Sequence, residues 1–298
     1  MTLLSNKEAL TFCASEYDTL HKVILCEPRH MAIEEVINET QKHYQDDNID
    51  RKLAMMEHRQ FTEALREHGV EVEILEASPD FPEQVFTRDI GFTVGETLFV
   101  AEMASDIRQG EEKLLKKQLK KRKIPYKDLK MGSIEGGDVI VDRTNVYVGI
   151  SSRTNEDAIS ELEQSLPDSY RVHRIPFHER YLHLDCVFNI LSPEEALVFP
   201  QAIDREALKL LESRYDLIEV MEEEQFTLGT NVLSIGNRKV FSLPVNKKVN
   251  RQLRSRGYTV IQIDLSEIIK SGGSFRCCTL PVMRNPIGSD AKTMRRQS

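Results

Sequence analysis

Two adjacent cysteines near the C-terminus are well suited to covalent chemistry. Cys277 and Cys278 lie in the segment SGGSFRCCTLPV, just after a Gly-Gly pair. A cysteine thiolate is a nucleophile, and a histidine commonly serves as its proton partner. The segment HLDC supplies a histidine, His183, and a carboxylate, Asp185. Three interpretations compete for these residues: a metal site, simple packing and a nucleophilic site.

The metal and packing interpretations each account for part of the pattern. His, Asp and Cys all bind zinc, but the sequence contains neither C-x-x-C nor H-x-x-x-H. If HLDC is a strand, alternation places His183 and Asp185 on one side and Cys186 on the other. We therefore expect no metal. Free cysteines bury readily, so the cysteine pair alone favours packing, and Gly136-Gly137 is then only a strand bulge.

A cationic substrate accounts for the thiol, the histidine and several carboxylates together. Carboxylates near a thiol raise its pKa, so they fit a nucleophilic site only if the substrate brings positive charge. A guanidinium is planar, offers up to five N–H donors and pairs bidentately with carboxylates. Acids that hold it would turn its electron-poor carbon toward the sulfur.

A repeated design in the sequence indicates how these residues are positioned. Five segments each place a polar signature before a β-type apolar run, and in four of them a hairpin-like turn and a second run follow. The segments are FTRDIGFTVGETLFVAEM from Phe86, IEGGDVIVDRTNVYVGIS from Ile134, HLDCVFNILSPEEALVFP from His183, TLGTNVLSIGNRKVFSLP from Thr227 and GGSFRCCTLPV from Gly272. Helical segments followed by short strand candidates lie between them.

The repeat predicts an α/β fold with one domain over residues 1–285, built from five ββαβ units around a pseudo-fivefold axis. The last segment lacks a second strand, and the N-terminal strand HKVILCEP can supply it and close the ring. Residues 286–298 are polar and predict a flexible tail. The polar signatures stand at the same point of each unit and should converge. The predicted central site contains Asp89, Glu135, His183, Asp185, Asn231, Cys277 and Cys278.

The composition narrows the classes of partner. The 298 residues carry a formal net charge of -8, which argues against nucleic acid as a partner. The sequence contains no stretch of 18 or more apolar residues, so it predicts no membrane span. The chain has five cysteines and no signal-like opening segment, so we expect a cytoplasmic protein without disulfides. The basic run at 113–123 predicts a solvated helix face.

Four motifs in this order resemble the guanidino-group-modifying enzymes, which include arginine deiminases, dimethylarginine dimethylaminohydrolases and amidinotransferases. The motifs are FTRD (86–89), EGGDV (135–139), HLD (183–185) and GGSFRCCT (272–279). The resemblance covers residues 22–281. It implies the pentein fold, a five-bladed α/β-propeller, in agreement with the repeat.

The resemblance implies a covalent mechanism. Cys277 matches the nucleophile and Cys278 is left as packing, while His183 matches the general acid/base. Glu135 joins these catalytic residues as an acid at the guanidinium. Asp89 matches a substrate-binding acid, and Asp185 matches either another such acid or a residue that orients His183; no metal or organic cofactor is implied. Asn231 has no implied role.

Two arginines complete the expected site. Arg153, in GISSRTN, resembles the arginine that holds an amino-acid α-carboxylate; the alternative is an exposed arginine at a helix start. Arg88, in FTRD, is a second expected substrate-binding residue, although it can also simply pair with a nearby acid.

The expected function is hydrolysis of a guanidino C–N bond, with arginine or an N-methylated arginine as the best candidates. Only 46 residues separate Asp89 from Glu135, so the extra helical domain of long arginine deiminases has no room, whereas the Asp in HLD is typical of deiminases and amidinotransferases. An amidinotransferase and a non-catalytic arginine-binding module are the alternatives. The segment 30–59 is expected to form a lid or entrance helix. The expected partner is a small guanidino molecule, with a homodimer left open.

Overall fold

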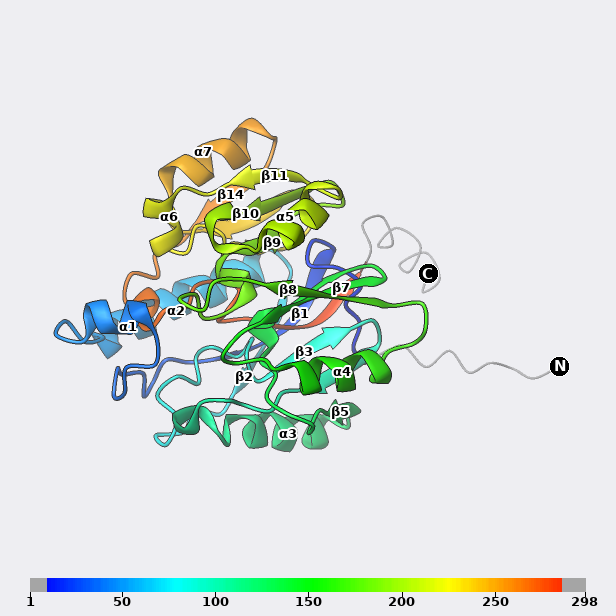
Figure 1. Cartoon of the computed structure of the whole chain (residues 1–298). Coiled ribbons are helices and arrows are strands. Elements are labelled where there is room, and N and C mark those ends of the chain that lie inside the picture. The colour runs from blue at the N-terminus through cyan, green and yellow to red at the C-terminus, as the bar shows by residue number, and fades with distance from the viewer. Residues whose placement is uncertain (1–9, 286–298) are drawn as a thin grey trace, which may run out of the picture.

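Five small sheets make up the strand framework of the computed structural model, which describes residues 10–285 (Figure 1). The predicted tail at 286–298 lies outside the described residues. Each sheet has three strands, and its middle strand pairs antiparallel with one neighbour and parallel with the other. The sheets are β15 (Leu280–Asn285), β1 (Thr19–Cys26), β2 (Glu71–Leu75); β3 (Gly91–Val94), β4 (Thr97–Val100), β5 (Tyr126–Asp128); β6 (Val139–Asp142), β7 (Asn145–Ile150), β8 (Arg171–Pro176); β9 (Phe188–Ile190), β10 (Glu195–Val198), β11 (Asp216–Glu219); and β12 (Leu233–Ser234), β13 (Lys239–Ser242), β14 (Thr259–Gln262).

The first sheet contains both ends of the described chain. β1 pairs antiparallel with β15 and parallel with β2. This pairing supplies the strand that the fifth repeat lacks in the sequence. It also brings the Cys277 turn, which directly precedes β15, close to β1.

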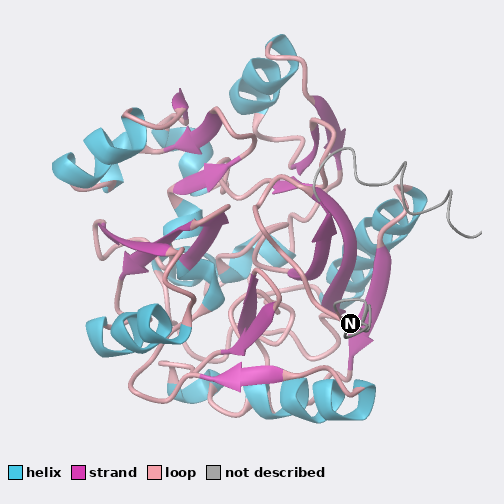
Figure 2. Cartoon of the chain, turned by 90° about the vertical axis from the view of Figure 1, so that its right-hand side faces the viewer, coloured by secondary structure: helices cyan, strands magenta, loops and turns pink. Residues whose placement is uncertain are grey.

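Helices join the parallel strands and lie mostly outside the strands in Figure 2. Polar side chains cap several of them: Asp50 accepts from the first turn of α2, Asn155 from that of α4 and Asp204 from that of α5. The helices are α1 (Glu39–Tyr44), α2 (Arg51–Glu67), α3 (Glu111–Arg122), α4 (Glu156–Ser165), α5 (Arg205–Glu212), α6 (Glu222–Phe226) and α7 (Lys247–Ser255). The basic run lies on α3, whose Leu115 and Leu119 are buried. The predicted lid segment contains α1 and the start of α2.

The polar signatures fold as tight turns, which corrects the strand prediction. GGD of the second repeat is the 3-10 helix η2 (Gly136–Asp138), and LDC of the third is η3 (Leu184–Cys186). Gly136-Gly137 is therefore not a strand bulge. The cysteine pair lies in a turn between η5 (Ile268–Ser271) and β15, where Cys278 N–H donates to Ser274 O at 3.0 Å. Strand alternation consequently does not determine where these side chains point.

The interior is built from apolar clusters, and polar side chains such as Glu57, Asn246 and Asn250 are also buried in it. The largest hydrophobic cluster includes Phe61, Phe241, Phe275 and both adjacent cysteines. Within residues 10–285, none of the helices has the length and hydropathy needed to cross a membrane.

Candidate active site

Cys277 lies at a small cavity. Two glycines that precede it allow the backbone to pass close to this cavity. Gly272 has a φ of +92°, which favours glycine. A Cβ on Gly273 would stand 2.2 Å from the Phe86 ring, so this position also requires glycine. Cys277 lines the cavity together with His183 and Asp89. Its Sγ is 4.0 Å from each carboxylate oxygen of Asp185. Burial, and then Asp185, raise the pKa of the Cys277 thiol well above its usual value.

His183 is held between two carboxylates. Its Nε2 is 2.7 Å from Glu135 Oε2, and its Nδ1 is 3.7 Å from Asp89 Oδ1. Burial alone would lower the pKa of His183, but Asp89 and the hydrogen bond with Glu135 raise it to about 9. A Cβ on Gly137 would come within 2.7 Å of the imidazole ring, so this glycine leaves the ring its place. The arrangement favours an imidazolium that can donate a proton.

A buried arginine that the sequence did not point to, Arg108, forms an ion pair with Asp89. Arg108 Nη1 donates to Asp89 Oδ2 at 2.6 Å, while its Nε and Nη2 hold Glu111 at 3.1 and 2.9 Å. Arg108 also lines the cavity beside Cys277. Its segment, SDIRQGEE, looked like a plain helix start. The signal that remained was the Arg-x-x-Glu spacing, which places both residues on one face of a turn. We call Asp89, Arg108 and Glu111 the first triad.

A second buried arginine backs Asp185 in the same way. Arg276 Nε lies 3.3 Å from Asp185 Oδ2, and its Nη1 lies 2.6 Å from Glu16 Oε2. We call Asp185, Arg276 and Glu16 the second triad. Asn231, which had no expected role, supports the same turn: its Oδ1 accepts from the backbone N–H of Arg276 and of Cys277 at 3.1 and 3.3 Å.

The two arginines that were expected to bind substrate have different surroundings. Arg153 is buried rather than exposed; its Nη1 is 3.7 Å from Glu135 Oε1, and its Nη2 donates to Ile37 O at 3.2 Å. Arg88 is also buried, but its guanidinium lies against Glu16, at 3.8 Å, and the Arg276 carbonyl. The structure therefore brings Arg153 beside the Glu135–His183 pair and does not bring Arg88 to the cavity.

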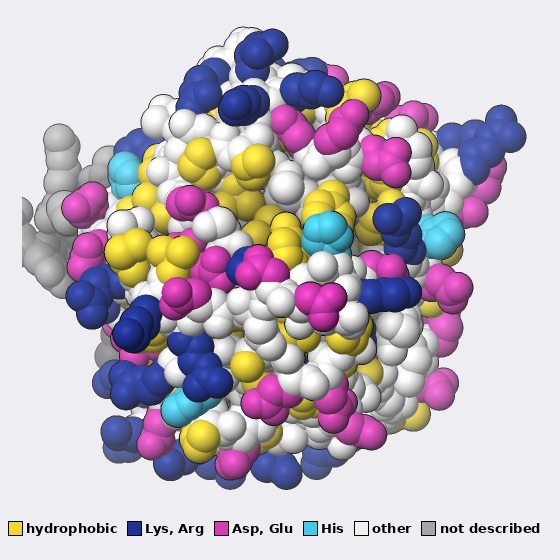
Figure 3. All heavy atoms as spheres, turned by 90° about the vertical axis from the view of Figure 1, so that its left-hand side faces the viewer, with side chains coloured by type: hydrophobic (Ala, Val, Ile, Leu, Met, Phe, Trp, Pro, Cys, Tyr) yellow, Lys and Arg dark blue, Asp and Glu magenta, His cyan; other side chains and the backbone are white. Residues whose placement is uncertain are grey.

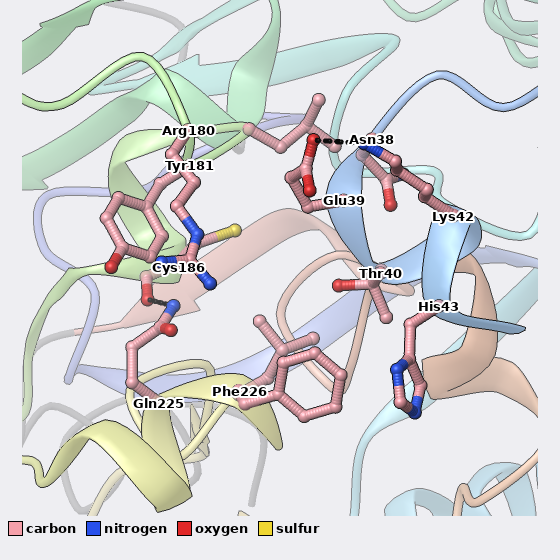
Figure 4. Close-up of a pocket in the computed structure, with 13 residues that line it drawn as sticks. Asn38, Glu39, Thr40, Lys42, His43, Arg180, Tyr181, Cys186, Gln225 and Phe226 are labelled. Atoms are coloured by element: carbon pink, nitrogen blue, oxygen red, sulfur yellow. Dashed lines mark hydrogen bonds and ion pairs between the residues drawn. The ribbon is translucent and has the colours of Figure 1, made fainter.

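The cavity is narrow and adjoins a wider pocket. The space beside Cys277 measures about 10 Å³, roughly one water molecule. A pocket of about 300 Å³ shares Asn38, Leu182 and Gly272 with it. We call the wider space the entrance pocket; residues of α1 line one side and residues of the 180–186 segment and α6 line the other (Figure 4). Access of a guanidinium to Cys277 requires these walls to separate.

Helix α1 borders the entrance pocket. Hydrogen bonds from two side chains hold it over the site. Asn38 Nδ2 donates to Ser271 O at 3.0 Å, and Gln41 Nε2 donates to Glu83 Oε1 at 2.7 Å. The molecular face on this side is mixed: apolar side chains gather near its middle, and charged side chains of both signs surround them (Figure 3).

One set of side chains has the composition of a metal site. Donor atoms of Asp89, Glu135 and His183 lie within 4.8 Å of one another. His183 Nε2 is engaged by Glu135, and Asp89 is engaged by the cation of Arg108. A bound cation would compete with both partners, and the expected absence of a metal stays a prediction from the sequence.

Comparisons with a protein family and with curated relatives place the chain among the guanidino-group-modifying enzymes, and solved structures share its fold. Its residues 27–284 match the family described as "N,N dimethylarginine dimethylhydrolase, eukaryotic". The chain belongs to this family. It is therefore a guanidino-group hydrolase or amidinotransferase of the dimethylarginine dimethylaminohydrolase and arginine deiminase type.

Individual relatives agree with this placement. The uncharacterized protein YkgA of Bacillus subtilis (strain 168) is 58% identical over 274 residues, which are 92% of this chain and 96% of YkgA. The N(G),N(G)-dimethylarginine dimethylaminohydrolase of Mycobacterium tuberculosis is 27% identical over 239 residues, 78% of this chain and 77% of that enzyme. Among solved structures, the N-terminal domain of the cyanobacterial arginine dihydrolase ArgZ has a TM-score of 0.81 at 23% identity, covering 90% of this chain and 98% of that one. This last likeness shows the pentein-type fold.

Proposed function

We propose that this protein is a hydrolase that cleaves a C–N bond of arginine or an N-methylated arginine, giving citrulline and ammonia or an amine. The observation that carries this proposal is the cavity shared by Cys277, His183 and Asp89, with Asp185 4.0 Å from the sulfur. A thiol, a proton-donating imidazole and two acids that can hold a guanidinium meet at one point. Five sheets arranged as the blades of a propeller would explain why four distant motifs converge there.

The first step is attack on the guanidinium carbon. Asp89 and Asp185 bind the substrate cation from two sides. Their negative charge is then balanced, so the Cys277 thiol loses its proton to solvent more easily. The Cys277 thiolate bonds to the carbon, and the C–N bond breaks as His183 donates its proton to the leaving amine.

The second step is hydrolysis of the amidino-thioether on Cys277. His183, now neutral, accepts a proton from a water molecule whose oxygen attacks the same carbon. The C–S bond breaks, which returns the thiolate and releases the urea group of citrulline. Glu135 holds the imidazole in place through both steps, as its 2.7 Å contact with Nε2 indicates.

Arg153 is the remaining assignment from the sequence. We propose that it holds the substrate carboxylate once α1 moves, because its guanidinium contacts the Ile37 carbonyl next to α1. A homodimer and a cytoplasmic location stay predictions from the sequence.

A substrate panel tests the function. The purified protein is incubated with arginine, monomethylarginine, dimethylarginine, agmatine and guanidinoacetate, and products are identified by mass spectrometry. Citrulline with ammonia, methylamine or dimethylamine supports a hydrolase. Ornithine with a new guanidine, formed only when an acceptor amine is added, would instead identify an amidinotransferase. No product from any guanidine would contradict the proposal.

A further inference from the structure

Three arginines are buried behind the candidate active site, and a single glutamate lies among them. Arg88, Arg276 and Arg284 are exposed by 3%, 1% and 1%. Arg276 pairs with Glu16 at 2.6 Å, and Arg88 lies 3.8 Å from the same carboxylate oxygen. Buried guanidinium groups are costly without a counter-charge. Glu16 precedes β1 and belongs to none of the four motifs.

Glu16 is held rigidly in this position. Its Oε1 accepts from Val141 N–H at 3.1 Å, and its own N–H donates to the Val141 carbonyl at 3.1 Å. Although burial raises the pKa of Glu16, the guanidinium groups of Arg276, Arg88 and Arg284 lower it to about 2. Glu16 is therefore a fixed negative charge.

Arg276 connects this fixed charge to the reacting atoms. Its Nη1 faces Glu16 and its Nε faces Asp185, at 2.6 and 3.3 Å. Asp185 in turn lies 4.0 Å from Cys277 Sγ. Because one guanidinium serves two carboxylates, the hold of Glu16 on Arg276 limits how completely Arg276 neutralises Asp185.

We propose that Glu16 is a positioning residue for the proposed reaction: by holding Arg276, it keeps Asp185 available to the substrate cation. The inference rests on the proposed roles of Asp185 and Cys277. Without the charge of Glu16, Arg276 pairs fully with Asp185. Substrate then binds more weakly, while the thiol, facing less negative charge, ionises more readily.

Other charged and titratable groups also face these two side chains. Those around Cys277 are Asp185, Asp89, Glu83, Cys186, His183 and Arg108. Those around Glu16 are Arg276, Arg88, Arg284 and Cys13. None of them is altered by the variants below except Arg88, which is changed on purpose.

The test measures substrate affinity, which should fall, and the reactivity of the Cys277 thiol, which should rise. In Glu16→Gln, we expect KM for the best guanidine to rise about tenfold with kcat changed less, and alkylation of Cys277 by neutral iodoacetamide near pH 8 to become several-fold faster. A merely structural role would weaken binding and leave the rate of Cys277 alkylation unchanged. The matched control is Glu195→Gln, a buried acid outside the four motifs that accepts from Tyr258 Oη at 2.8 Å and pairs with Arg256 at 3.2 Å; it should change neither quantity.

Arg88→Gln should change the alkylation rate of Cys277 in the opposite direction. It also keeps the inference testable if Glu16→Gln does not fold. Arg88 Nη2 has no hydrogen-bond partner, so its loss should be tolerated. Removing this cation leaves Glu16 to Arg276 and Arg284, which strengthens its hold on Arg276, and should slow alkylation of Cys277 about threefold. Unchanged or faster alkylation in Arg88→Gln, or unchanged or slower alkylation in folded Glu16→Gln, would overturn the inference. If the wild type turns over no guanidine, the proposed function fails, whereas the alkylation rates still report on Glu16.

Discussion

The two acid–arginine–acid triads beside Cys277 have the same design but differ in how tightly the central arginine holds the site acid. In the first, Arg108 binds Asp89 at 2.6 Å and grips Glu111 through two nitrogens. In the second, Arg276 binds Glu16 at 2.6 Å and stands 3.3 Å from Asp185. Asp89 is therefore strongly compensated, whereas Asp185, next to the sulfur, is less compensated by its arginine, and burial raises the pKa of its carboxyl.

The difference indicates a division of work between the two acids. Asp89 lines the cavity wall with Arg108 already in place, so a substrate guanidinium must share this carboxylate. Asp185 offers the less compensated charge and lies at the reacting sulfur. We infer that Asp185 contributes more to holding the substrate carbon against Cys277.

The largest expected effect comes from removing each acid's charge. Asp185→Asn should lower kcat/KM by about 10³-fold and Asp89→Asn by about 10²-fold, because loss of one partner of a buried charged pair costs about 2–5 kcal/mol. Steady-state kinetics on the best guanidine measures both. Equal losses, or a larger loss in Asp89→Asn, would remove the proposed division of work.

The first triad can be tested by stability. Arg108→Gln leaves Asp89 and Glu111 buried without a cation and should lower the free energy of unfolding by about 3–5 kcal/mol. Arg122→Gln is the control, because it breaks a 2.7 Å pair with Glu73 in which the arginine is largely exposed, and should cost about 1 kcal/mol or less. Urea denaturation compares them. Similar losses in the two variants would show that the first triad is not strongly coupled.

His183, which faces the first triad through Asp89, should make stability depend on pH. Its pKa in the folded state is raised to about 9 from 6.5, so its stabilisation is complete below pH 6.5 and is lost as the pH rises through 9. Glu83 and Glu111, whose pKa values burial raises to about 7, lose their stabilising contributions at lower pH than His183 does. Between pH 7 and 10 the wild type should therefore lose up to about 3 kcal/mol more than His183→Gln. Parallel curves would mean that His183 titrates near its ordinary value.

The smallest effect is expected at the second cysteine. Cys278 is fully buried, and its backbone carbonyl accepts from Thr87 Oγ1 at 3.1 Å. Cys278→Ser should cost about 1–3 kcal/mol of stability, through a polar atom placed in the core, and change kcat by no more than a few-fold. Loss of activity in folded Cys278→Ser would place the chemistry at the wrong sulfur.

Much of the framework was predictable because it repeats. The spacing of the signatures indicated five units, and five three-stranded sheets are present. Alternation failed at HLDC because three of its residues form a 3-10 turn, which does not have the two-residue period of a strand. The grouping of HLDC with the cysteine pair was predictable only from the phase of the repeats.

The triads were predictable to different degrees. Arg108 and Glu111 are three residues apart, so local spacing contained a signal. Glu16 and Arg276 are 260 positions apart, and the pairing of β15 with β1 and with Phe12 brings their segments together. Arg88 was assigned to the substrate because it adjoins Asp89 in sequence, yet successive side chains of this turn diverge, and its guanidinium lies with Glu16.

Labelling of the nucleophile tests the central claim most directly. The wild type and Cys277→Ser are incubated with 2-chloroacetamidine, an amidine electrophile that carries the guanidinium-like cation, and the adduct is located by peptide mass spectrometry. The account predicts one adduct per chain, on Cys277, that excess substrate slows and that Cys277→Ser lacks. An unmodified wild type, or an adduct on Cys278 or Cys186 instead, would contradict it.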